Sequence, residues 1–281
     1  MYIIFDIGGT KTRVAASEDL VSYGEPIKFN TPLNYEEGLA AIAKAAEELS
    51  KGQKIDDMAG GVRGRLRPDR TGIMAEVVLT DWVAKPLVKD LSERFKSPVY
   101  IENDTAVVGL GETVFGAGKG YDIVAYHTVS TGVGGVRCVD GKIDRAHIGF
   151  EIGHQIIDVD KSIFGNDMVH TLENMVSGTA LQERRGVKPY EIDQFDPVWD
   201  ELAYYLAIGL RNTILYWSPD VIVLGGSMVV GDPRIFREDI IKHTEKVLDG
   251  FLPCPPILDA TLKDEGGLCG GMALLRERLE R

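Results

Sequence analysis

Cysteine and long apolar runs are both scarce in this chain, and each absence narrows what it can be. Its 281 residues include only Cys138, Cys254 and Cys269, which are too few and too scattered for a disulfide framework or a four-ligand zinc site. No apolar run approaches the roughly 18 residues of a membrane-spanning helix, and the start MYIIFD lacks the basic flank of a signal peptide. We therefore expect a cytoplasmic protein that is not embedded in a membrane.

An excess of positive charge is also missing. The chain has 31 Lys and Arg against 43 Asp and Glu, a formal net charge of −12. That sign argues against broad nucleic-acid binding or attachment to an anionic membrane surface. With 44% hydrophobic and 26% charged residues, the composition is that of an ordinary globular protein, long enough for two domains.

The chain opens with IIFDIGGTKTRVA, in which two β-rich runs flank Gly8 and Gly9. The pattern predicts a hairpin whose turn takes glycine because it needs positive φ. A turn without side chains also exposes backbone N–H groups that can bind a phosphate, although the P-loop pattern is absent. A plain hairpin does not explain the polar residues around the glycines: Asp6, Thr10, Lys11 and Arg13. Taken alone, the turn fits a hairpin and a phosphate grip equally well.

Predicted strands and helices alternate along the chain, which favours an α/β fold. The second half opens like the first, with a strand, a Thr/Gly-rich turn at residues 130–135, a returning strand and a tight Asp140-Gly141 turn. A third glycine pair, Gly225-Gly226, follows a buried strand. Helices are expected near residues 34–52, 83–96, 105–118, 167–178, 196–219, 232–252 and 267–280. The repetition predicts duplicated lobes around a central cleft, with a glycine turn at each end of a nucleotide's phosphates.

Five segments then narrow the function. DIGGTKTRVA, IENDTAVVGLGE, STGVGGV with DGKI, EIGH and LENMVSG occur in this order, and with them the chain resembles the ROK family of sugar kinases and sugar-responsive repressors over nearly its whole length. The resemblance implies a two-lobed, actin-like sugar-kinase fold. One lobe would span residues 1–103 and be completed by a C-terminal helix at about 268–281, and the other would span residues 104–267.

The family's activity is implied in the same way. It is ATP-dependent phosphorylation of a hexose or N-acetylhexosamine, with Mg²⁺. The repressors carry a DNA-binding domain before the first glycine turn, whereas five residues precede Asp6 here, so we expect a kinase. A homodimer is an oligomeric state that the sequence leaves open.

The resemblance assigns roles to individual residues. Asp104 corresponds to the general base that takes the proton of the sugar hydroxyl, although Asn and Asp are also ordinary helix caps. The implied sugar ligands are Gly64, Asn103, Asp104, Glu151, His154 and Glu173. The implied phosphate and nucleoside contacts are Gly8, Gly9, Thr10, Lys11, Arg13, Thr131, Gly132, Gly225 and Gly226. Asp6 is expected to hold Mg²⁺ through water.

The segment after His154 departs from the family. Many members continue with a Cys-rich stretch that binds zinc together with the His, but no cysteine lies between Cys138 and Cys254 here. Asp167 and His170 could be invoked as replacement ligands, yet a solvated loop is the simpler interpretation. We expect no zinc site.

A second departure is GGVRGRLRPDR at residues 60–70, where Arg63 replaces the family's usual Pro. Arg65, Arg67 and Arg70 complete a basic cluster, which fits either local ion pairs in a solvated loop or an anionic partner such as an acidic sugar or polyphosphate. The sequence Leu79-Thr80-Asp81 before Trp82 also differs from the family's Asn-Leu and leaves the sugar open.

Two alternatives to an ATP-dependent sugar kinase remain at this point. One is a non-catalytic protein that keeps the fold to sense a sugar or a nucleotide. The other is a kinase that uses polyphosphate as the donor. Sugar-dependent ADP release would separate them.

Overall fold

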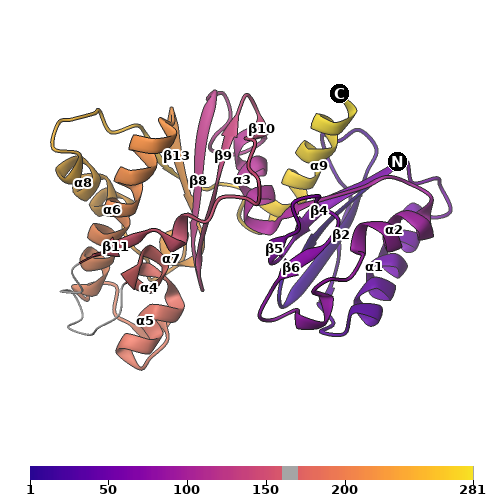
Figure 1. Ribbon diagram of the computed structural model, residues 1–281, viewed down its shortest axis with the longest axis horizontal. Helices are drawn as coiled ribbons and strands as arrows, with labels where there is room; N and C mark the ends of the chain where they lie inside the picture. The colour runs from indigo at the N-terminus through magenta and orange to yellow at the C-terminus, as the bar shows by residue number, and fades with distance from the viewer. Residues whose placement is uncertain (160–169, 281) are drawn as a thin grey trace. The chain divides into compact units, whose positions relative to one another are not determined.

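The computed structural model describes residues 1–159 and 170–280 (Figure 1). Its contacts divide the chain into two compact units. Unit 1 comprises Met1–Phe115, Gly141–Gly149 and Asp264–Arg281, and unit 2 comprises Gly116–Asp140 and Phe150–Lys263. This division differs from the expected boundary at residues 103 and 104, because the helix that starts at Asp104 packs against the C-terminal helix within unit 1.

Unit 1 contains a five-stranded sheet, four α-helices and several short elements. Its strands are β1 (Tyr2–Ile7), β2 (Lys11–Ser17), β3 (Ile27–Asn30), β4 (Asp57–Val62), β5 (Arg65–Leu66), β6 (Ile73–Ala75), β7 (Val99–Asn103) and β10 (Lys142–Ile143). Its helices are α1 (Tyr35–Ser50), α2 (Leu87–Phe95), α3 (Asp104–Val114), α9 (Gly266–Leu279) and the 3-10 turn η1 (Thr80–Trp82), and a further turn, η4 (Lys263–Glu265), begins at the unit boundary.

The first sheet has the strand order β3-β2-β1-β4-β7. β1 and β2 form the predicted antiparallel hairpin, whereas β1, β4 and β7 run parallel. Helices cover both faces: α1 and α2 lie on one, and α3 and α9 on the other (Figure 1). Successive side chains of β1 are therefore buried on opposite faces of the sheet. Phe5 lies in the core that includes α1 and α2, and Ile4 lies beneath Gly271 of α9.

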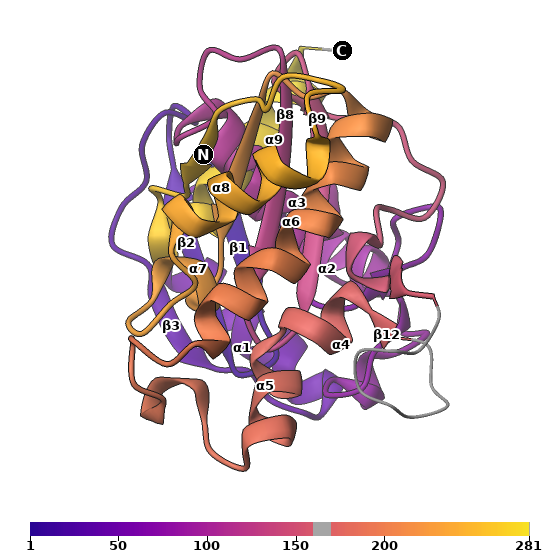
Figure 2. The same ribbon diagram turned by 90° about the vertical axis from the view of Figure 1, so that its left-hand side faces the viewer.

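Unit 2 is built in the same way around a second sheet. Its strands are β8 (Ile123–Val129), β9 (Val133–Val139), β11 (Ile156–Asp158), β12 (His170–Thr171), β13 (Val221–Gly225) and β14 (Ile257–Asp259). Its helices are α4 (Leu172–Val176), α5 (Gly178–Arg185), α6 (Val198–Trp217), α7 (Ser227–Val230) and α8 (Arg237–Leu248), with the 3-10 turns η2 (Ile152–His154) and η3 (Pro189–Glu191). Figure 2 shows α6 and α8 in front of the second sheet.

The second sheet repeats the first. Its order is β10-β9-β8-β13-β14, with an antiparallel β8–β9 hairpin followed by parallel β13 and β14. The edge strand β10 belongs to this sheet although its residues are grouped with unit 1. Asp140 and Gly141 take φ angles of 52° and 72° between β9 and β10, as the Asp-Gly turn predicts. Each sheet thus has the order third, second, first, fourth, fifth strand, and the prediction of an α/β fold with duplicated lobes is confirmed.

The described helices include none that is long and apolar enough to cross a membrane.

Candidate active site

The candidate site of unit 1 forms at the carboxyl ends of its parallel strands. The register pairs Asp6 of β1 with Gly61 of β4, and Val62 with Asn103 of β7. Asp6, Arg63 and Asp104 therefore come to the same edge of the sheet, where open α/β sheets bind their ligands.

Asp104 is the first residue of α3 and is partly buried. Its Oδ1 accepts hydrogen bonds from the N–H of Thr105 at 2.8 Å and from Nδ2 of Asn103 at 3.1 Å. Burial raises the pKa of Asp104 above its ordinary value, although these bonds and the positive charge of Arg63 act in the other direction. A Cβ on Gly61 would lie 3.1 Å from the Cα of Asp104, so glycine at 61 lets β4 approach the carboxylate.

Asn103 caps α3 and orients Asp104. Its Oδ1 accepts from the N–H of Ala106 at 3.2 Å, and its Nδ2 also donates to the carbonyl of Gly64 at 3.2 Å. Gly64 has a φ of +107°, which favours glycine. Both predicted sugar ligands thus lie beside Asp104, with Asn103 already engaged as a cap.

The first glycine turn is held in place by hydrogen bonds from Thr31. Thr31 donates through Oγ1 to the carbonyl of Gly8 at 2.8 Å and through N to that of Thr10 at 2.9 Å, while Thr10 and Lys11 are exposed. The expected positive φ is wrong, since neither Gly8 nor Gly9 is in the left-handed region. Glycine is needed there for close approach instead: a Cβ on Gly8 would lie 3.0 Å from the carbonyl oxygen of Lys11.

Asp6 pairs with a cation across the hairpin. Its Oδ2 accepts from Nη1 of Arg13 at 3.2 Å, and Arg13 also lies 3.6 Å from Asp264. Burial raises the pKa of Asp6 to about 6, with Arg13 lowering it and the charge of Asp104 raising it. Arg13, predicted to contact phosphate, is therefore already bound to carboxylates.

Two arginines of the basic cluster, Arg67 and Arg70, form ion pairs with carboxylates. Arg70 pairs with Glu102 at 2.9 Å, and Arg67 lies 3.6 Å from Asp69 at the surface. Arg65 is exposed in β5. Arg67 therefore fits the solvated loop with local ion pairs, whereas Arg70 pairs with Glu102 of β7, outside the loop. Arg63 pairs with Glu76 at 3.1 Å, an acid that the sequence did not indicate because nothing in the pattern distinguishes it from the other carboxylates of the chain.

The segment at residues 79–82, which left the sugar open, has a structural role. Oδ2 of Asp81 accepts from the N–H of Tyr35 at 2.9 Å and from Nδ2 of Asn34 at 3.3 Å, at the start of α1. Trp82 is buried and its Nε1 donates to the carbonyl of Pro32 at 3.1 Å. Asp81 and Trp82 therefore hold α1 in place.

In unit 2, the glycine turn between β8 and β9 contacts one of the predicted sugar ligands, Glu173 of α4. Oε2 of Glu173 accepts from the N–H of Val133 at 2.7 Å, and a Cβ on Gly132 would lie 2.6 Å from the same oxygen. The carbonyl of Thr131 accepts from Oγ1 of Thr179 at 2.7 Å. Glu173 and the turn at residues 130–133 thus form one hydrogen-bonded cluster.

The other predicted residues of unit 2 lie around this cluster. Gly225 ends β13, paired with Thr128 of β8, and Gly226 has a φ of +87°. Gly153 lies between Glu151 and His154, and a Cβ there would lie 2.3 Å from the carbonyl oxygen of Val133, so η2 packs directly on the turn. Glu151 and His154 are both exposed at the two ends of η2.

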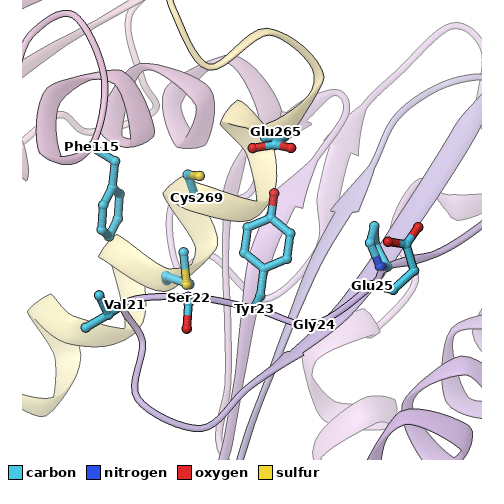
Figure 3. Close-up of a pocket in the computed structure, with 10 residues that line it drawn as sticks. Val21, Ser22, Tyr23, Gly24, Glu25, Phe115, Glu265 and Cys269 are labelled. Atoms are coloured by element: carbon cyan, nitrogen blue, oxygen red, sulfur yellow. The ribbon is translucent and has the colours of Figure 1, made fainter.

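A pocket of about 400 Å³ lies elsewhere in unit 1, between the β2–β3 loop and α9. Figure 3 shows the Tyr23 hydroxyl pointing toward the start of α9, where Glu265 and Cys269 lie. Burial raises the pKa of the Cys269 thiol to about 11, so the thiol is protonated at neutral pH and a poor nucleophile. None of the predicted site residues lines this pocket, and it is not the candidate active site.

The residues present fit Mg²⁺ bound through water. Asp6 and Asp104 are close enough for their charges to oppose each other, and Mg²⁺ prefers one or two carboxylates together with substrate phosphates and retained waters. Within residues 1–159 and 170–280, no three His, Cys, Asp or Glu side chains are grouped as metal ligands. Asp167 lies outside the described residues, and the absence of zinc stays a prediction.

Known proteins resemble this chain along its whole length. A model described as the ROK family matches residues 2–278. A fructokinase of Streptococcus mutans is 27% identical, over 99% of this chain and 98% of its own length. A ROK hexokinase from Thermus thermophilus matches with a TM-score of 0.85 and 27% identity, over 100% of this chain and 99% of its own. A ROK glucokinase from Streptomyces griseus, solved with glucose and AMPPNP, matches with a TM-score of 0.78 and 27% identity, over 98% and 99% of the two chains. This chain therefore belongs to the ROK family, as a carbohydrate kinase with the actin-like, two-lobed α/β fold.

Proposed function

We propose that the protein transfers the terminal phosphoryl group of ATP to a hydroxyl of a hexose or an N-acetylhexosamine, with Asp104 as the general base. The observation that carries this proposal is the surroundings of Asp104. Its carboxylate is oriented by Asn103 and the N–H of Thr105 at the carboxyl edge of the sheet, and burial raises its pKa. A carboxylate that is fixed in place and made more basic is suited to accept a proton late in phosphoryl transfer.

The sugar is proposed to bind through Gly64, Asn103, Glu151, His154 and Glu173. Carboxylates, an imidazole and an amide suit the vicinal hydroxyls of a sugar, because they donate and accept directional hydrogen bonds. Relatives named fructokinase and glucokinase act on different hexoses by name, so the family alone does not choose the sugar.

The phosphates of ATP are proposed to bind at the two glycine turns. Both turns are hydrogen-bonded to neighbouring side chains, to Thr31 in unit 1 and to Glu173 and Thr179 in unit 2. Backbone amides that are already oriented can bind an anion with little reorganisation. The proposed contacts are Gly8, Gly9, Thr10, Lys11, Arg13, Thr131 and Gly132, with Gly225 and Gly226 at the nucleoside end. Mg²⁺, held by the phosphates and by Asp6 through water, would neutralise charge on the transferred group.

In the proposed reaction, Asp104 orients the attacking hydroxyl and takes its proton as the new bond to phosphorus forms. Asn103 keeps the base in position by donating to Oδ1, and Arg13 favours the ionised form of Asp6 by pairing with it. The donor leaves as ADP. The residues thus supply positioning and charge, which are most of what phosphoryl transfer requires.

The test is a panel of hexoses, amino-hexoses and N-acetyl-hexosamines, with ATP or polyphosphate as the donor. We expect one sugar, or a few related ones, to give sugar-dependent ADP release with ATP and a matching sugar phosphate by mass spectrometry. Sugar phosphate formed with polyphosphate but not with ATP would contradict the donor. No product across the panel with either donor would favour a sugar or nucleotide sensor and overturn the proposal.

A further inference from the structure

Arg63 lies against the first glycine turn. Its backbone N–H donates to the carbonyl of Ile7 at 2.8 Å, which places it directly beyond the end of β4. Its side chain then crosses Gly9: a Cβ on Gly9 would lie 2.9 Å from Cδ and 3.5 Å from Cζ of Arg63. The guanidinium group therefore packs on the backbone of the turn, and glycine at position 9 leaves room for it.

The same guanidinium is near the proposed base. Burial raises the pKa of Asp104, and the positive charge of Arg63 is one of the influences that lower it. Arg63 is thus close to both the proposed phosphate site at Gly8 and Gly9 and the carboxylate that would accept the sugar proton.

Glu76 holds Arg63 in this place while leaving part of it accessible. Oε1 of Glu76 accepts from Nε of Arg63 at 3.1 Å and from the N–H of Val78 at 2.8 Å. The Glu76 side chain is 6% exposed and that of Arg63 is 36% exposed. Among the described residues, Nη1 and Nη2 of Arg63 donate to no partner. A fixed guanidinium with two open N–H₂ groups matches the oxygens of a phosphoryl group.

Resting on the function proposed above, we propose that Arg63 is a further catalytic residue, whose Nη groups bind the oxygens of the transferred phosphoryl group, and that Glu76 is its positioning residue. In the step concerned, the sugar oxygen forms a bond to the terminal phosphorus and the bond from that phosphorus to the ADP oxygen breaks. The sugar proton passes to Asp104, and ADP keeps the bonding electron pair. The negative charge of the transferred group is then balanced in part by Arg63.

An ordinary structural ion pair is the alternative, and the neighbouring arginines provide the comparison. Arg67 pairs at the surface with Asp69, and Arg70 with Glu102. Of these three side chains, Arg63 is the one that packs on the glycine turn. Arg67→Gln is therefore a matched control, because it removes the same charge from the same loop without touching the turn.

The test uses steady-state kinetics of the full chain with the best sugar from the panel. Arg63→Gln keeps a donor for Glu76 but loses the charge, and we expect kcat to fall at least about 100-fold, with the KM for sugar changed by less than about threefold. The kcat of Arg63→Lys should lie between those of the parent and Arg63→Gln, because an ammonium group keeps the charge but loses the two-pronged geometry of the guanidinium. Arg67→Gln should match the parent.

Two further measurements separate catalysis from structure. Added guanidinium ion at millimolar concentration should raise the kcat of Arg63→Ala at least about tenfold and leave the parent and Arg67→Gln unchanged. Glu76→Gln should lower kcat in the parent but have little further effect in the Arg63→Gln background, since a residue that acts through another gives non-additive losses.

Arg63→Gln with a kcat within about threefold of the parent would overturn the inference while leaving the proposed function in place. A folded Arg63→Ala variant that guanidinium does not rescue, with additive effects of Glu76→Gln, would assign the pair a structural role and also overturn it. A parent protein that phosphorylates no sugar in the panel would instead overturn the proposed function itself.

Discussion

Asp6 and Asp104 are two carboxylates at one edge of the first sheet, and their neighbours differ. Burial raises the pKa of both. Asp6 is paired with Arg13 and lies under the first turn of α9, where a Cβ on Gly267 would come within 2.6 Å of its Cγ. Asp104 instead accepts hydrogen bonds from Asn103 and Thr105. A carboxylate paired with a guanidinium suits charge organisation, and one held by neutral donors suits proton transfer.

The first prediction at this scale concerns pH. Asp104 acts as a base only when it is deprotonated, so kcat/KM should fall as pH drops through its pKa. Because burial raises that pKa, we expect the acid limb to lie above the ordinary range of an aspartate. The charged groups around Asp104 are Arg63, Glu76 and Asp6, with Arg13 and Asp264 beside Asp6.

The measurement is kcat/KM for the sugar against pH, at saturating ATP and Mg²⁺. An activity that stays flat down to the ordinary pKa of aspartate, in protein that remains folded, would contradict a raised pKa at the base.

Glu173 gives the second prediction. It is proposed to bind the sugar, but it also accepts the N–H of Val133 in the glycine turn. Glu173→Gln keeps an oxygen for Val133 and loses the charge, so we expect the KM for sugar to rise about tenfold, as for a charged hydrogen bond weakened by about 1.4 kcal/mol, with a smaller loss of kcat. A rise confined to the KM for ATP would mean that Glu173 only supports the turn.

At the scale of elements, the packing of α9 explains why this helix contains so many glycines. It contains Gly266, Gly267, Gly270 and Gly271, which would weaken an isolated helix. Each of these glycines approaches another element closely, and at Gly270 a Cβ would lie 1.8 Å from the carbonyl oxygen of Val107 in α3. The helix is stable in the folded protein because α3 and the sheet pack on its glycine face.

This contact gives the third prediction. Gly270→Ala should force α3 and α9 apart and destabilise unit 1 by about 3 kcal/mol, a fall in the thermal midpoint of roughly 5–10 °C. Gly24→Ala is the control, since a Cβ there meets only the carbonyl of Ala16 at 4.0 Å. Calorimetry that finds the same midpoint for both variants would show that the α3–α9 contact can relax.

The elements also show what the sequence could predict. Long helices could be predicted from their sequence patterns. α1 begins after its Asn34 cap as expected, and α6 and α9 occupy their predicted segments. Short elements were missed, among them β3 at the sheet edge and the β5–β6 hairpin, because runs of two to four residues carry too little periodicity. The predicted helix at 83–96 starts only at Leu87, after Pro86, since proline disfavours helical conformation in the residue before it.

The features of the candidate site also fall into those that the sequence could predict and those that it could not. The glycine turns were predicted because Gly pairs mark them in the sequence, whereas the role of Asp104 was implied by the resemblance to the ROK family. The partners of Arg13 and Arg63 were not, because Asp6, Asp264 and Glu76 meet these arginines only through the register of the folded sheet and its loops. The need for glycine at position 9 likewise comes from a side chain that is distant in sequence.

At the scale of the whole molecule, the two sheets share one strand order, and each has a glycine turn between its first two strands. The same repetition is visible in the sequence, which is why the duplicated fold could be predicted from motifs alone. The chain departs from the family pattern most clearly at Arg63 and in the cysteine-free segment after His154.

A further prediction concerns the zinc content of the whole protein. Protein purified without an affinity tag should contain well under one zinc per chain by elemental analysis, because the segment after His154 has no cysteine. A zinc-selective chelator, with Mg²⁺ in excess, should leave activity and the melting temperature unchanged. Stoichiometric zinc would mean that ligands other than cysteine have been recruited.

The most direct test of the account is the kcat of Asp104→Asn measured beside the parent, with sugar and ATP affinities taken from calorimetry. Asparagine keeps the size of the side chain but cannot take the proton, so we expect kcat to fall by about 10²–10⁴, or roughly 3–5.5 kcal/mol of barrier. Both affinities should change only a few-fold. A variant that turns over within about tenfold of the parent would contradict the assignment of Asp104 as the base.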